Sequence, residues 1–536
     1  MDDGEFDGII VGGGYNGLTL AGYMAKQGLK VLVLERRMSY GGATITEEVT
    51  KPGFYHNLHA NFVWSYGPPH QDFELQRYGL RLMYGEVERC YLFGDGSTLT
   101  TYTDDPHRTY NQFKTVLPKS DVDTLEEVYY RFLRKVEEEF YAPPKPTEER
   151  GVGLEDDDRK QYQRFCEMTG REVLDTLYES DKLKTWAAMN ACVRGMPDFA
   201  PGTGDFFLRY AASPKLSIVR GGSRQIAHAL AAFFHANGGV ILNDSHVEQI
   251  VIEGGRATGV RTSDGRSFRA AKFVASAIDP PATFLRLVGE EHISAQIAER
   301  CRHWETEHHT ALFGLHAATD VAPDYTPKYP DEANRSLCIF MGVNSLEELD
   351  EHWRQIEQGH MPDQPGGDAC CHTVIDRSYA PPGKHTLLFW QFGPPADRLE
   401  GGRVSYDDIK EAYLEKMADR WRQYAPNLTK DHVLGRYAYT PADIQERIVN
   451  MVGGGCRQGA YTNDQWGYNR PFPEASGYRT PIEGLYLCGS ACHPGGSIHF
   501  GPGYNAANVI VTDLGLERWW PPYRIQGKPV VSSASG

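Results

Sequence analysis

The chain begins with two short, largely apolar runs that flank an amphipathic stretch. Residues 6–11 and 30–34 have the length and apolar content of buried strands. Residues 18–27 read as a helix, and Gly28 follows as a helix stop. The pattern predicts strand, helix and strand in succession, which is the repeating unit of a parallel sheet.

Two later regions repeat this alternation of strands and helices. The first predicts an amphipathic helix over residues 223–236, with Ser223 as its N-cap and Gly238-Gly239 at its end. Four β-rich runs follow, at 240–242, 246–252, 257–262 and 272–276. Near the C-terminus, a short strand at 485–487 precedes a glycine-rich loop and a helix at 504–513.

The remaining chain has a different pattern. Residues 106–213 are mostly helical in periodicity, with a proline- and charge-rich loop at 142–158. Residues 295–474 mix strands such as "TALFGLHAAT" and "KHTLLFWQFG" with a helix at 405–424. We expect this part to form an antiparallel sheet with helices, which would make the floor of a substrate site.

Glycines mark the first turn from strand to helix. Gly12, Gly14 and Gly17 form G-x-G-x-x-G, and Glu35 follows about twenty residues later. The first glycine permits a tight turn, the second lets the backbone approach a pyrophosphate, and the third lets the helix pack on the strand. The helix N-terminus offers N–H groups to phosphates, and the acid can bind a ribose diol. The sequence therefore predicts a dinucleotide site, and Asn16 within the turn is part of it.

The segment after the acid indicates which dinucleotide binds. Gly41 and Gly42, followed by Ala43, resemble the flavoprotein extension in which a glycine pair continues along the pyrophosphate towards the ribityl chain. NAD-only domains usually lack this extension. The predicted cofactor is therefore FAD, and Arg36 either flanks the adenosine ribose or is a solvated charge.

The two later regions resemble further parts of glutathione-reductase-like flavoproteins. In the second FAD-binding segment of that group, the equivalent of Val247 touches the adenine through its backbone. The C-terminal glycine-rich loop feeds a helix whose N-terminus, in flavoproteins, faces the flavin C2 carbonyl and stabilises the anionic reduced ring. The further cofactor contacts predicted in this part are Gly489, Ser490, Gly503, Tyr504 and Asn505.

These segments predict an α/β fold: a glutathione-reductase-like FAD-binding Rossmann domain with an inserted, mixed antiparallel-sheet and helix substrate domain. The FAD-binding domain takes three parts of the chain, 1–105, 215–290 and 475–536. Residues 106–214 form a helical lid or substrate region, and residues 291–474 form the substrate domain.

The chain also resembles the phytoene-desaturase-type branch of FAD-dependent oxidoreductases. The resemblance rests on the first glycine turn, Glu35 with Gly41-Gly42, "GGSRQIAHAL", "VASAIDP" and, above all, "HPGGSIHFGPGYNAA". The resemblance is clear in sequence over about 200 residues. Over the two inserted regions, 106–214 and 291–474, it extends only to the predicted arrangement of elements. It implies an enzyme that carries out FAD-dependent redox chemistry.

The composition of the chain limits the kinds of molecule that it is expected to bind. The 536 residues carry 55 Lys and Arg against 71 Asp and Glu, a net charge of −16, which argues against nucleic acid as a partner. The mean hydropathy is −0.49, and no apolar run is long enough to span a membrane. Both features differ from membrane-associated carotenoid enzymes and favour a smaller hydrophobic or aromatic substrate. The acidic N-terminus and ten scattered cysteines predict a cytoplasmic protein with reduced thiols.

Candidate acid–base groups lie in loops that the fold should bring near the flavin. His59, His499 and Tyr504 are the predicted catalytic residues, because histidine is the commonest acid or base near neutral pH. His493 precedes a proline, which also fits a conformational role. Covalent flavin attachment through a histidine or Cys492 stays open, and no metal is expected.

We expect an FAD-dependent dehydrogenase, desaturase or oxidase that takes a hydride from a C–C or C–O bond. Since only one dinucleotide fingerprint is visible, electrons should pass to oxygen or a quinone-like acceptor. Three alternatives stay open: a flavin amine oxidase, a redox-neutral double-bond isomerase that uses reduced FAD, and a catalytically silent FAD-binding protein. The aromatic cluster Trp519-Trp520 with Tyr523 predicts internal packing or a homodimer contact.

Overall fold

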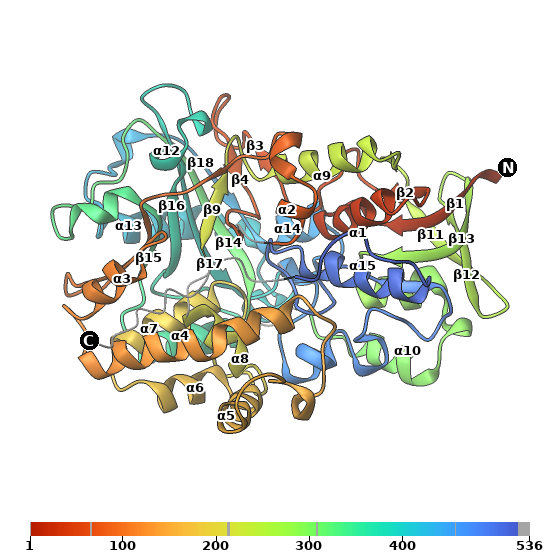
Figure 1. Ribbon diagram of the computed structural model, residues 1–536. Helices are drawn as coiled ribbons and strands as arrows, with labels where there is room; N and C mark the ends of the chain where they lie inside the picture. Colours follow the sequence, from red (N-terminus) through yellow and green to blue (C-terminus); the bar gives the residue numbers. More distant parts are fainter. Residues whose placement is uncertain (1, 65–66, 212–214, 307–308, 456, 524–536) are drawn as a thin grey trace.

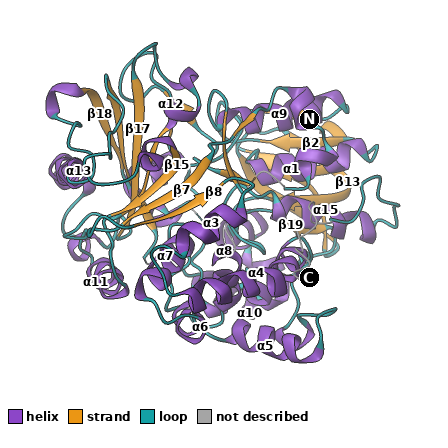
Figure 2. Ribbon diagram, turned by 60° about the vertical axis from the view of Figure 1, so that its left-hand side comes forward, coloured by secondary structure: helices purple, strands orange, loops and turns teal. Residues whose placement is uncertain are grey.

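The computed structural model describes residues 2–64, 67–211, 215–306, 309–455 and 457–523. The last residues of the predicted third part of the FAD-binding domain, 524–536, lie outside the described residues. Two seven-stranded sheets organise the chain, and most helices of residues 106–211 gather below them in the view of Figure 2. This arrangement confirms the predicted class, an α/β fold with an FAD-type Rossmann domain and a substrate domain.

The first sheet is assembled from three distant parts of the chain, which meet on the right of Figure 1. The pairs β10–β2, β2–β1, β1–β13 and β13–β19 are parallel, whereas β13, β12 and β11 form an antiparallel meander. In spatial order the strands are β10 (Val240–Leu242), β2 (Val31–Leu34), β1 (Asp2–Val11), β13 (Ser267–Ser276), β12 (Arg256–Thr262) and β11 (Val247–Glu253), with β19 (Leu485–Leu487) beside β13.

The register aligns the carboxyl ends of the parallel strands. Val11 pairs with both Leu34 and Ser276, and these pair in turn with Leu242 and Leu487. In open α/β sheets ligands bind at this edge. The sheet therefore places the glycine turn after β1, the acid after β2 and the C-terminal loop after β19 side by side.

Three helices of this domain lie close together: α1 (Tyr15–Lys26), α9 (Arg224–Ala236) and α15 (Gly501–Asp513). The predicted helices are confirmed, with α15 beginning three residues earlier than expected. The predicted N-cap at Ser223 is confirmed, but its side chain makes no capping hydrogen bond, and its Oγ donates to the Ile45 carbonyl. Asn57 Oδ1 and Thr46 Oγ1 instead accept hydrogen bonds from the first N–H groups of the helix.

The second sheet confirms the expected antiparallel floor. Every neighbouring pair is antiparallel except β15 and β7. Strands β7 and β8 come from residues that the sequence analysis assigned to the FAD-binding domain. They join the second sheet because the backbone of β7, whose residues are all buried, pairs in parallel with β15. In order the strands are β18 (Val433–Tyr439), β14 (Ala311–Thr319), β17 (His385–Gly393), β16 (Gly367–Cys371), β15 (Ser336–Met341), β7 (Val87–Leu92) and β8 (Thr98–Tyr102).

Helices cover the second sheet and fill the space beside it. The predicted loop at 142–158 is shorter than expected, because α5 begins at Asp156. The remaining helices are α2 (Pro69–Asp72), α3 (Pro106–Phe113), α4 (Lys119–Phe140), α5 (Asp156–Glu167), α6 (Gly170–Leu177), α7 (Asp181–Cys192), α8 (Gly204–Ala211), α10 (Ala295–Arg302), α11 (Leu346–Glu357), α12 (His372–Ile375), α13 (Tyr406–Arg422), α14 (Pro441–Arg447) and a π-helix at Ala282–Val288. Short strands are β3 (Thr46–Glu47), β4 (His56–Asn57), β5 (Val63–Trp64), β6 (Leu82–Met83) and β9 (Leu216–Val219).

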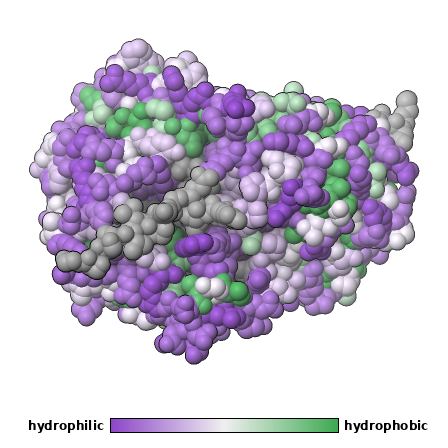
Figure 3. All heavy atoms as spheres, viewed as in Figure 1, coloured by the Kyte–Doolittle hydropathy of each residue, from purple (hydrophilic) through white to green (hydrophobic). Residues whose placement is uncertain are grey.

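The structure tests two expectations from the sequence: the absence of a membrane-spanning helix and the packing of the aromatic residues near the C-terminus. Hydrophilic side chains dominate the face in Figure 3, and no helix among the described residues is long and apolar enough to cross a bilayer. Trp520 is buried, with its ring 4.6 Å from that of Tyr23, and Trp519 stacks on the same tyrosine at 5.7 Å. The predicted internal packing of this cluster is therefore confirmed.

Gly17 sets how closely α1 approaches the sheet, and its replacement tests the fold. A Cβ at this position would lie 2.3 Å from the Gly12 carbonyl oxygen and 3.3 Å from Ala277 Cβ. Both neighbours are fixed by the sheet, so we expect Gly17→Ala to lower the free energy of unfolding by about 1–3 kcal/mol.

The measurement is chemical or thermal unfolding followed by circular dichroism. Gly28→Asn is the matched control: Gly28 has a φ of 89° after α1, a Cβ there would meet no atom within 4 Å, and asparagine tolerates this conformation. Equal stability of Gly17→Ala and wild type would contradict the close-packing account.

Candidate functional site

A cavity of about 510 Å³ runs along the carboxyl ends of the parallel strands. Its volume lies in the range of known cofactor sites, roughly 300–1,000 Å³. The cavity is bounded by the turn after β1, the residues after β2, the start of β11, the turn after β13, the C-terminal loop and the segment that follows α14. Its lining includes Gly12, Gly14, Asn16, Gly17, Glu35, Arg36, Gly42, Ala43, Val247, Ala277, Arg447, Met451, Gly489 and Ser490.

A ligand close to the backbone would account for glycine at position 14. Its φ of −67° and ψ of 166° are open to any residue, and the nearest atom to a Cβ built there is Gly42 Cα, at 4.0 Å. The protein alone therefore has room for a side chain at this position. A Cβ would instead occupy the cradle that the turn offers to a ligand, as a pyrophosphate-binding glycine requires.

The second glycine pair lies directly beside the first turn. Gly41 N donates to the Gly13 carbonyl at 2.8 Å, and Gly41 and Gly14 form an isolated parallel bridge. A Cβ on Gly42, whose φ is 58°, would lie 3.1 Å from Gly14 Cα. The two glycine segments therefore form one continuous surface of backbone groups.

Glu35 closes the other side of this cradle. Its carboxylate is buried and accepts hydrogen bonds from Gly13 N at 2.9 Å and Arg37 N at 2.8 Å. These two bonds fix its orientation and leave lone pairs for a ribose diol. Arg36 is exposed at the cavity mouth, and Val247 is buried at the start of β11.

The C-terminal loop contributes Gly489 and Ser490 to the cavity. Asn16 Nδ2 donates to Ser490 Oγ at 3.2 Å, while Asn16 Oδ1 is buried without a protein partner among the described residues. Arg470, which the sequence analysis did not single out, is fully buried and donates to the carbonyl of Ser490 at 2.9 Å. It also donates to the carbonyls of Gln465 and Arg457, so it anchors the loop to the neighbouring chain.

Three other residues predicted near the cofactor lie on α15. They face the elements that pack against this helix and are not among the residues that line the cavity. Gly503 lets α15 approach α1, because a Cβ there would lie 2.4 Å from the Asn16 carbonyl oxygen. Tyr504 packs on Tyr23, and its hydroxyl accepts from Tyr523 N at 3.0 Å. Asn505 Nδ2 donates to the Tyr478 hydroxyl at 2.9 Å. Their contact with a cofactor stays a prediction.

The two histidines of the C-terminal signature hold backbone groups. His499 is fully buried; its Nε2 lies 2.8 Å from the Gly496 carbonyl, and its Nδ1 accepts from Gly501 N at 3.0 Å. His493 Nε2 lies 3.1 Å from the Glu139 carbonyl, and burial lowers the pKa of His493 to about 4. These contacts explain how both side chains fix the loop, and a catalytic role for His499 stays a prediction.

A second cavity, of about 110 Å³, adjoins the first. Both cavities are lined by Tyr15, Ala43, Met451 and Ser490. The remaining lining of the second cavity is mainly apolar and aromatic, with a few polar side chains. It includes Phe62, Leu312, Trp390, Phe392 and Ile498 together with His59, Asn61, Arg194, Asp368 and Arg457.

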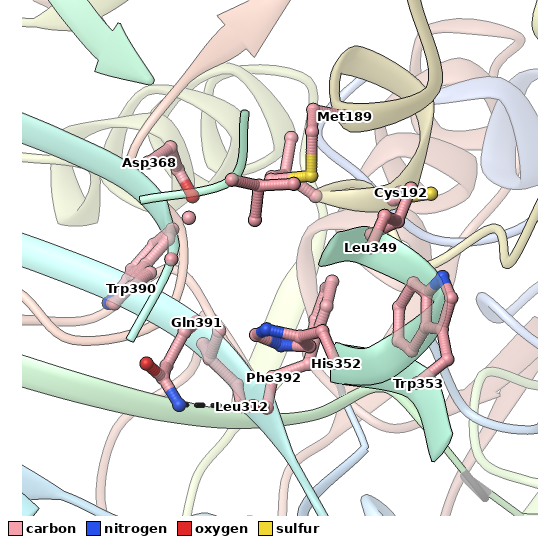
Figure 4. Close-up of a pocket in the computed structure, with 14 residues that line it drawn as sticks. Met189, Cys192, Leu312, Leu349, His352, Trp353, Asp368, Trp390, Gln391 and Phe392 are labelled. Atoms are coloured by element: carbon pink, nitrogen blue, oxygen red, sulfur yellow. Dashed lines mark hydrogen bonds between the residues drawn. The ribbon is translucent and has the colours of Figure 1, made fainter. Parts of the chain in front are cut away.

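A smaller space of about 20 Å³ continues beyond Trp390 and Phe392. Figure 4 shows Asp368 and Trp390 on one side of this space, with Met189, Leu349, His352 and Trp353 around the rest. The side chains thus form a narrow, mostly apolar recess that leads away from the cofactor-sized cavity.

His59 is the predicted catalytic residue that lines the second cavity. It is buried, and neither ring nitrogen has a partner among the described residues. Burial, with a smaller contribution from the charge of Arg457, lowers the pKa of His59 to about 3. The imidazole is therefore neutral at physiological pH and can accept or donate one hydrogen bond to a ligand.

The sequence analysis missed the other polar residues of this cavity. Asp368 lies on β16, opposite Trp390 of β17, and Arg194 and Arg457 come from loops far away in sequence. Arg457 Nε donates to the Arg194 carbonyl. None of the three belongs to a recognisable motif, so only the register of the second sheet and the packing of α7 bring them together.

Comparisons with known proteins agree with this geometry. A family model described as "flavin containing amine oxidoreductase" matches residues 16–510. A limonene dehydrogenase subunit of Castellaniella defragrans is 29% identical over 540 residues, which cover 96% of each chain. A 4,4'-diaponeurosporene oxygenase of Staphylococcus aureus is 22% identical over 91% of this chain and 94% of its own.

Solved structures show the same fold. An oxidoreductase from Methanosarcina mazei matches with a TM-score of 0.61 and 17% identity, over 94% of this chain and 99% of its own. A double mutant of putrescine oxidase matches with a TM-score of 0.61 and 15% identity, over 95% of this chain and 99% of its own. Together with the glycine cradle and Glu35, these matches support FAD as the cofactor.

The Gly14 cradle can be tested separately from the fold. We expect Gly14→Ala to leave the thermal unfolding of the apoprotein unchanged, because the added Cβ meets no protein atom closer than 4.0 Å. We expect its affinity for FAD to fall at least about tenfold, since the methyl group occupies the space of the pyrophosphate.

The measurement is a titration of apoprotein with FAD, followed by flavin fluorescence. Gly477→Ala is the matched control, because Gly477 also has room for a Cβ and lies outside the cavity lining. Wild-type affinity in Gly14→Ala would remove this glycine from the cofactor site.

Proposed function

Because the chain belongs to the family of flavin-containing amine oxidoreductases, we propose that it removes a hydride from a C–H bond of a small hydrophobic or aromatic substrate. The proposed enzyme is an FAD-dependent dehydrogenase, desaturase or oxidase. The observation that carries this proposal is the apolar cavity of about 110 Å³ that shares four lining residues with the cofactor-sized cavity. A substrate bound there would lie next to the cofactor.

The residues present fit FAD. The backbone of Gly12 to Gly17 and of Gly41-Gly42 would hold the pyrophosphate, Glu35 the adenosine ribose, and Val247 the adenine. Ser490, fixed through Asn16 and Arg470, would contact the part of the cofactor nearest the substrate. Bound FAD supplies a two-electron acceptor for a hydride.

The chain's own residues would bind and orient the substrate. Trp390 and Phe392 project from the same face of β17, and Leu312 comes from the neighbouring strand β14. These buried side chains exclude water and offer flat, apolar contacts, which favour a planar or cyclic ligand. The neutral His59 and the amide of Asn61 are the groups that could hydrogen-bond a hydroxyl or carbonyl.

The electrostatics of the cavity favour a neutral substrate over an amine. Arg194 and Arg457 line it, and the charge of Arg457 contributes to the low pKa of His59. Asp368 is the one acidic side chain among the described residues that line this cavity, so the two arginines outnumber it and a protonated amine would be disfavoured by a net positive field. The name of the relative from Castellaniella, a limonene dehydrogenase subunit, supports a hydrocarbon-like substrate for this chain as well. We further propose oxygen or a quinone-like compound as the electron acceptor, and a homodimer stays open.

The test is anaerobic mixing of the FAD-loaded protein with a panel of probes while the flavin absorbance is recorded. We expect limonene or a cyclic terpene alcohol to bleach the flavin, because these molecules are apolar and compact. We expect putrescine and benzylamine to leave it oxidised. Bleaching by the amines alone would make the protein an amine oxidase, and product isomers without net bleaching would make it an isomerase.

The size of the cavity supplies a second prediction. We expect Leu312→Trp to fill the space in front of Trp390 and to lower the rate of flavin bleaching by the active probe at least about tenfold. Leu312→Met is the matched control, because it conserves side-chain volume and should keep the rate within a few-fold. The visible spectrum of bound FAD shows that both variants retain the cofactor. An unchanged rate in Leu312→Trp would place the substrate elsewhere.

A further inference from the structure

The second cavity, in which we propose that the substrate binds, contains one buried carboxylate that belongs to no recognisable sequence motif. Among the described residues that line the two connected spaces of about 110 and 20 Å³, Asp368 is the only acidic side chain. It is 8% exposed. Its carboxylate accepts a hydrogen bond from its own backbone N–H. In the described part of the chain no side chain donates to it, which leaves acceptor capacity for a ligand.

Rigid backbone holds this carboxylate in place. Asp368 lies in the middle of the second sheet, where it pairs with Phe340 of β15 and Trp390 of β17. The preceding Gly367 has no space for a side chain, because a Cβ would lie 2.0 Å from the Trp390 carbonyl oxygen. The side chain therefore starts from a fixed point next to the aromatic wall of the cavity.

Several charged and titratable groups face Asp368. The guanidinium groups of Arg194, Arg457 and Arg89 favour its ionised form, but burial outweighs them and raises the pKa of Asp368 to about 7. The neighbouring thiols of Cys338 and Cys370 are neutral, because burial raises their own pKa values well above the usual range. A carboxylate that titrates near neutral pH is matched to general base catalysis there.

The histidines of the two spaces are poorer bases. The pKa of His59 is about 3 and that of His352 about 4, in both cases chiefly because of burial. A group with so low a pKa holds a proton weakly and provides little driving force for its removal from carbon or oxygen. Position and basicity together therefore favour the carboxylate of Asp368 over both histidines as the proton acceptor.

We propose that Asp368 is the catalytic residue that accepts the substrate proton during oxidation. This inference rests on the proposed function. The substrate loses one hydrogen with both electrons of its C–H bond to the bound cofactor, which is thereby reduced. A second hydrogen leaves as a proton from the adjacent carbon or oxygen to a carboxylate oxygen of Asp368, and the electrons of that bond form the new double bond. The acid returns its proton to solvent when the electron acceptor reoxidises the cofactor.

The pH dependence of flavin bleaching tests this role. Limonene and a cyclic terpene alcohol are the probes, used anaerobically with the FAD-loaded full chain. For the wild type, we expect the rate constant to rise with pH and level off above pH 7, because only ionised Asp368 accepts a proton. We expect Asp368→Asn to lose this profile and to react about 10²–10⁴-fold more slowly.

Two further variants separate a base from a structural role. Asp279→Asn is the matched control: its carboxylate is also buried, its pKa is also raised, and it lies outside the substrate cavity, so the wild-type profile should remain. His59→Gln tests the competing base. If His59→Gln abolished the pH dependence while Asp368→Asn kept it, the inference would be overturned.

An infrared measurement gives a readout that does not need turnover. The difference spectrum of the FAD-loaded protein between about pH 5 and about pH 9 should contain a protonated carboxyl band that Asp368→Asn lacks. If that band is absent, Asp368 is ionised throughout and the inference fails, whatever the substrate. If the band is present but no probe bleaches the wild-type flavin, the proposed function fails, and with it the proton-transfer step.

Discussion

The close approach of helix α1 to the strand ends is the constraint on which the site depends. Gly17 lies against the Gly12 carbonyl, and Gly503 lets α15 lie against the same helix from the other side. These contacts fix where the N-terminal turn of α1 faces the cavity. They also fix Asn16, and through it Ser490, at the junction of the two cavities. A side chain at Gly17 would push α1 away from the sheet, and one at Gly503 would push α15 away from α1, so either would move both binding surfaces.

The same scaffold sets the electrostatics of the substrate cavity. The second sheet, the end of α7 and the loop that carries Arg457 bring two arginines and one aspartate to the lining of one buried space, where charges interact strongly. The positive field and burial keep His59 neutral, and burial overrides that field at Asp368. Two side chains in one cavity are therefore tuned in ways that neither would show in solution.

The cofactor half of the site could be predicted from the sequence because its signals are local. The spacing of Gly12, Gly14 and Gly17 and the position of Glu35 are set by one turn and two strands, and the structure brings these residues together. The interior positions of Tyr504 and Asn505 could not be seen, since helical periodicity alone did not show which side of α15 faces α1. Ser223 was placed correctly as the N-cap, but the sequence could not show that Thr46 and Asn57, which are distant along the chain, bind the N–H groups at this helix start.

The polar residues that line the second cavity could not be predicted from the sequence, and the reason is physical. Asp368 is one acidic residue in an apolar strand, and a sequence gives no sign of whether such a residue meets solvent, an arginine or a ligand. Its surroundings come from sheet register with Trp390 and from two loops that are far apart along the chain. The chain has the fold of amine oxidases, yet the lining of its second cavity includes two arginines and a largely apolar wall, and on these features we base the proposal of a neutral substrate.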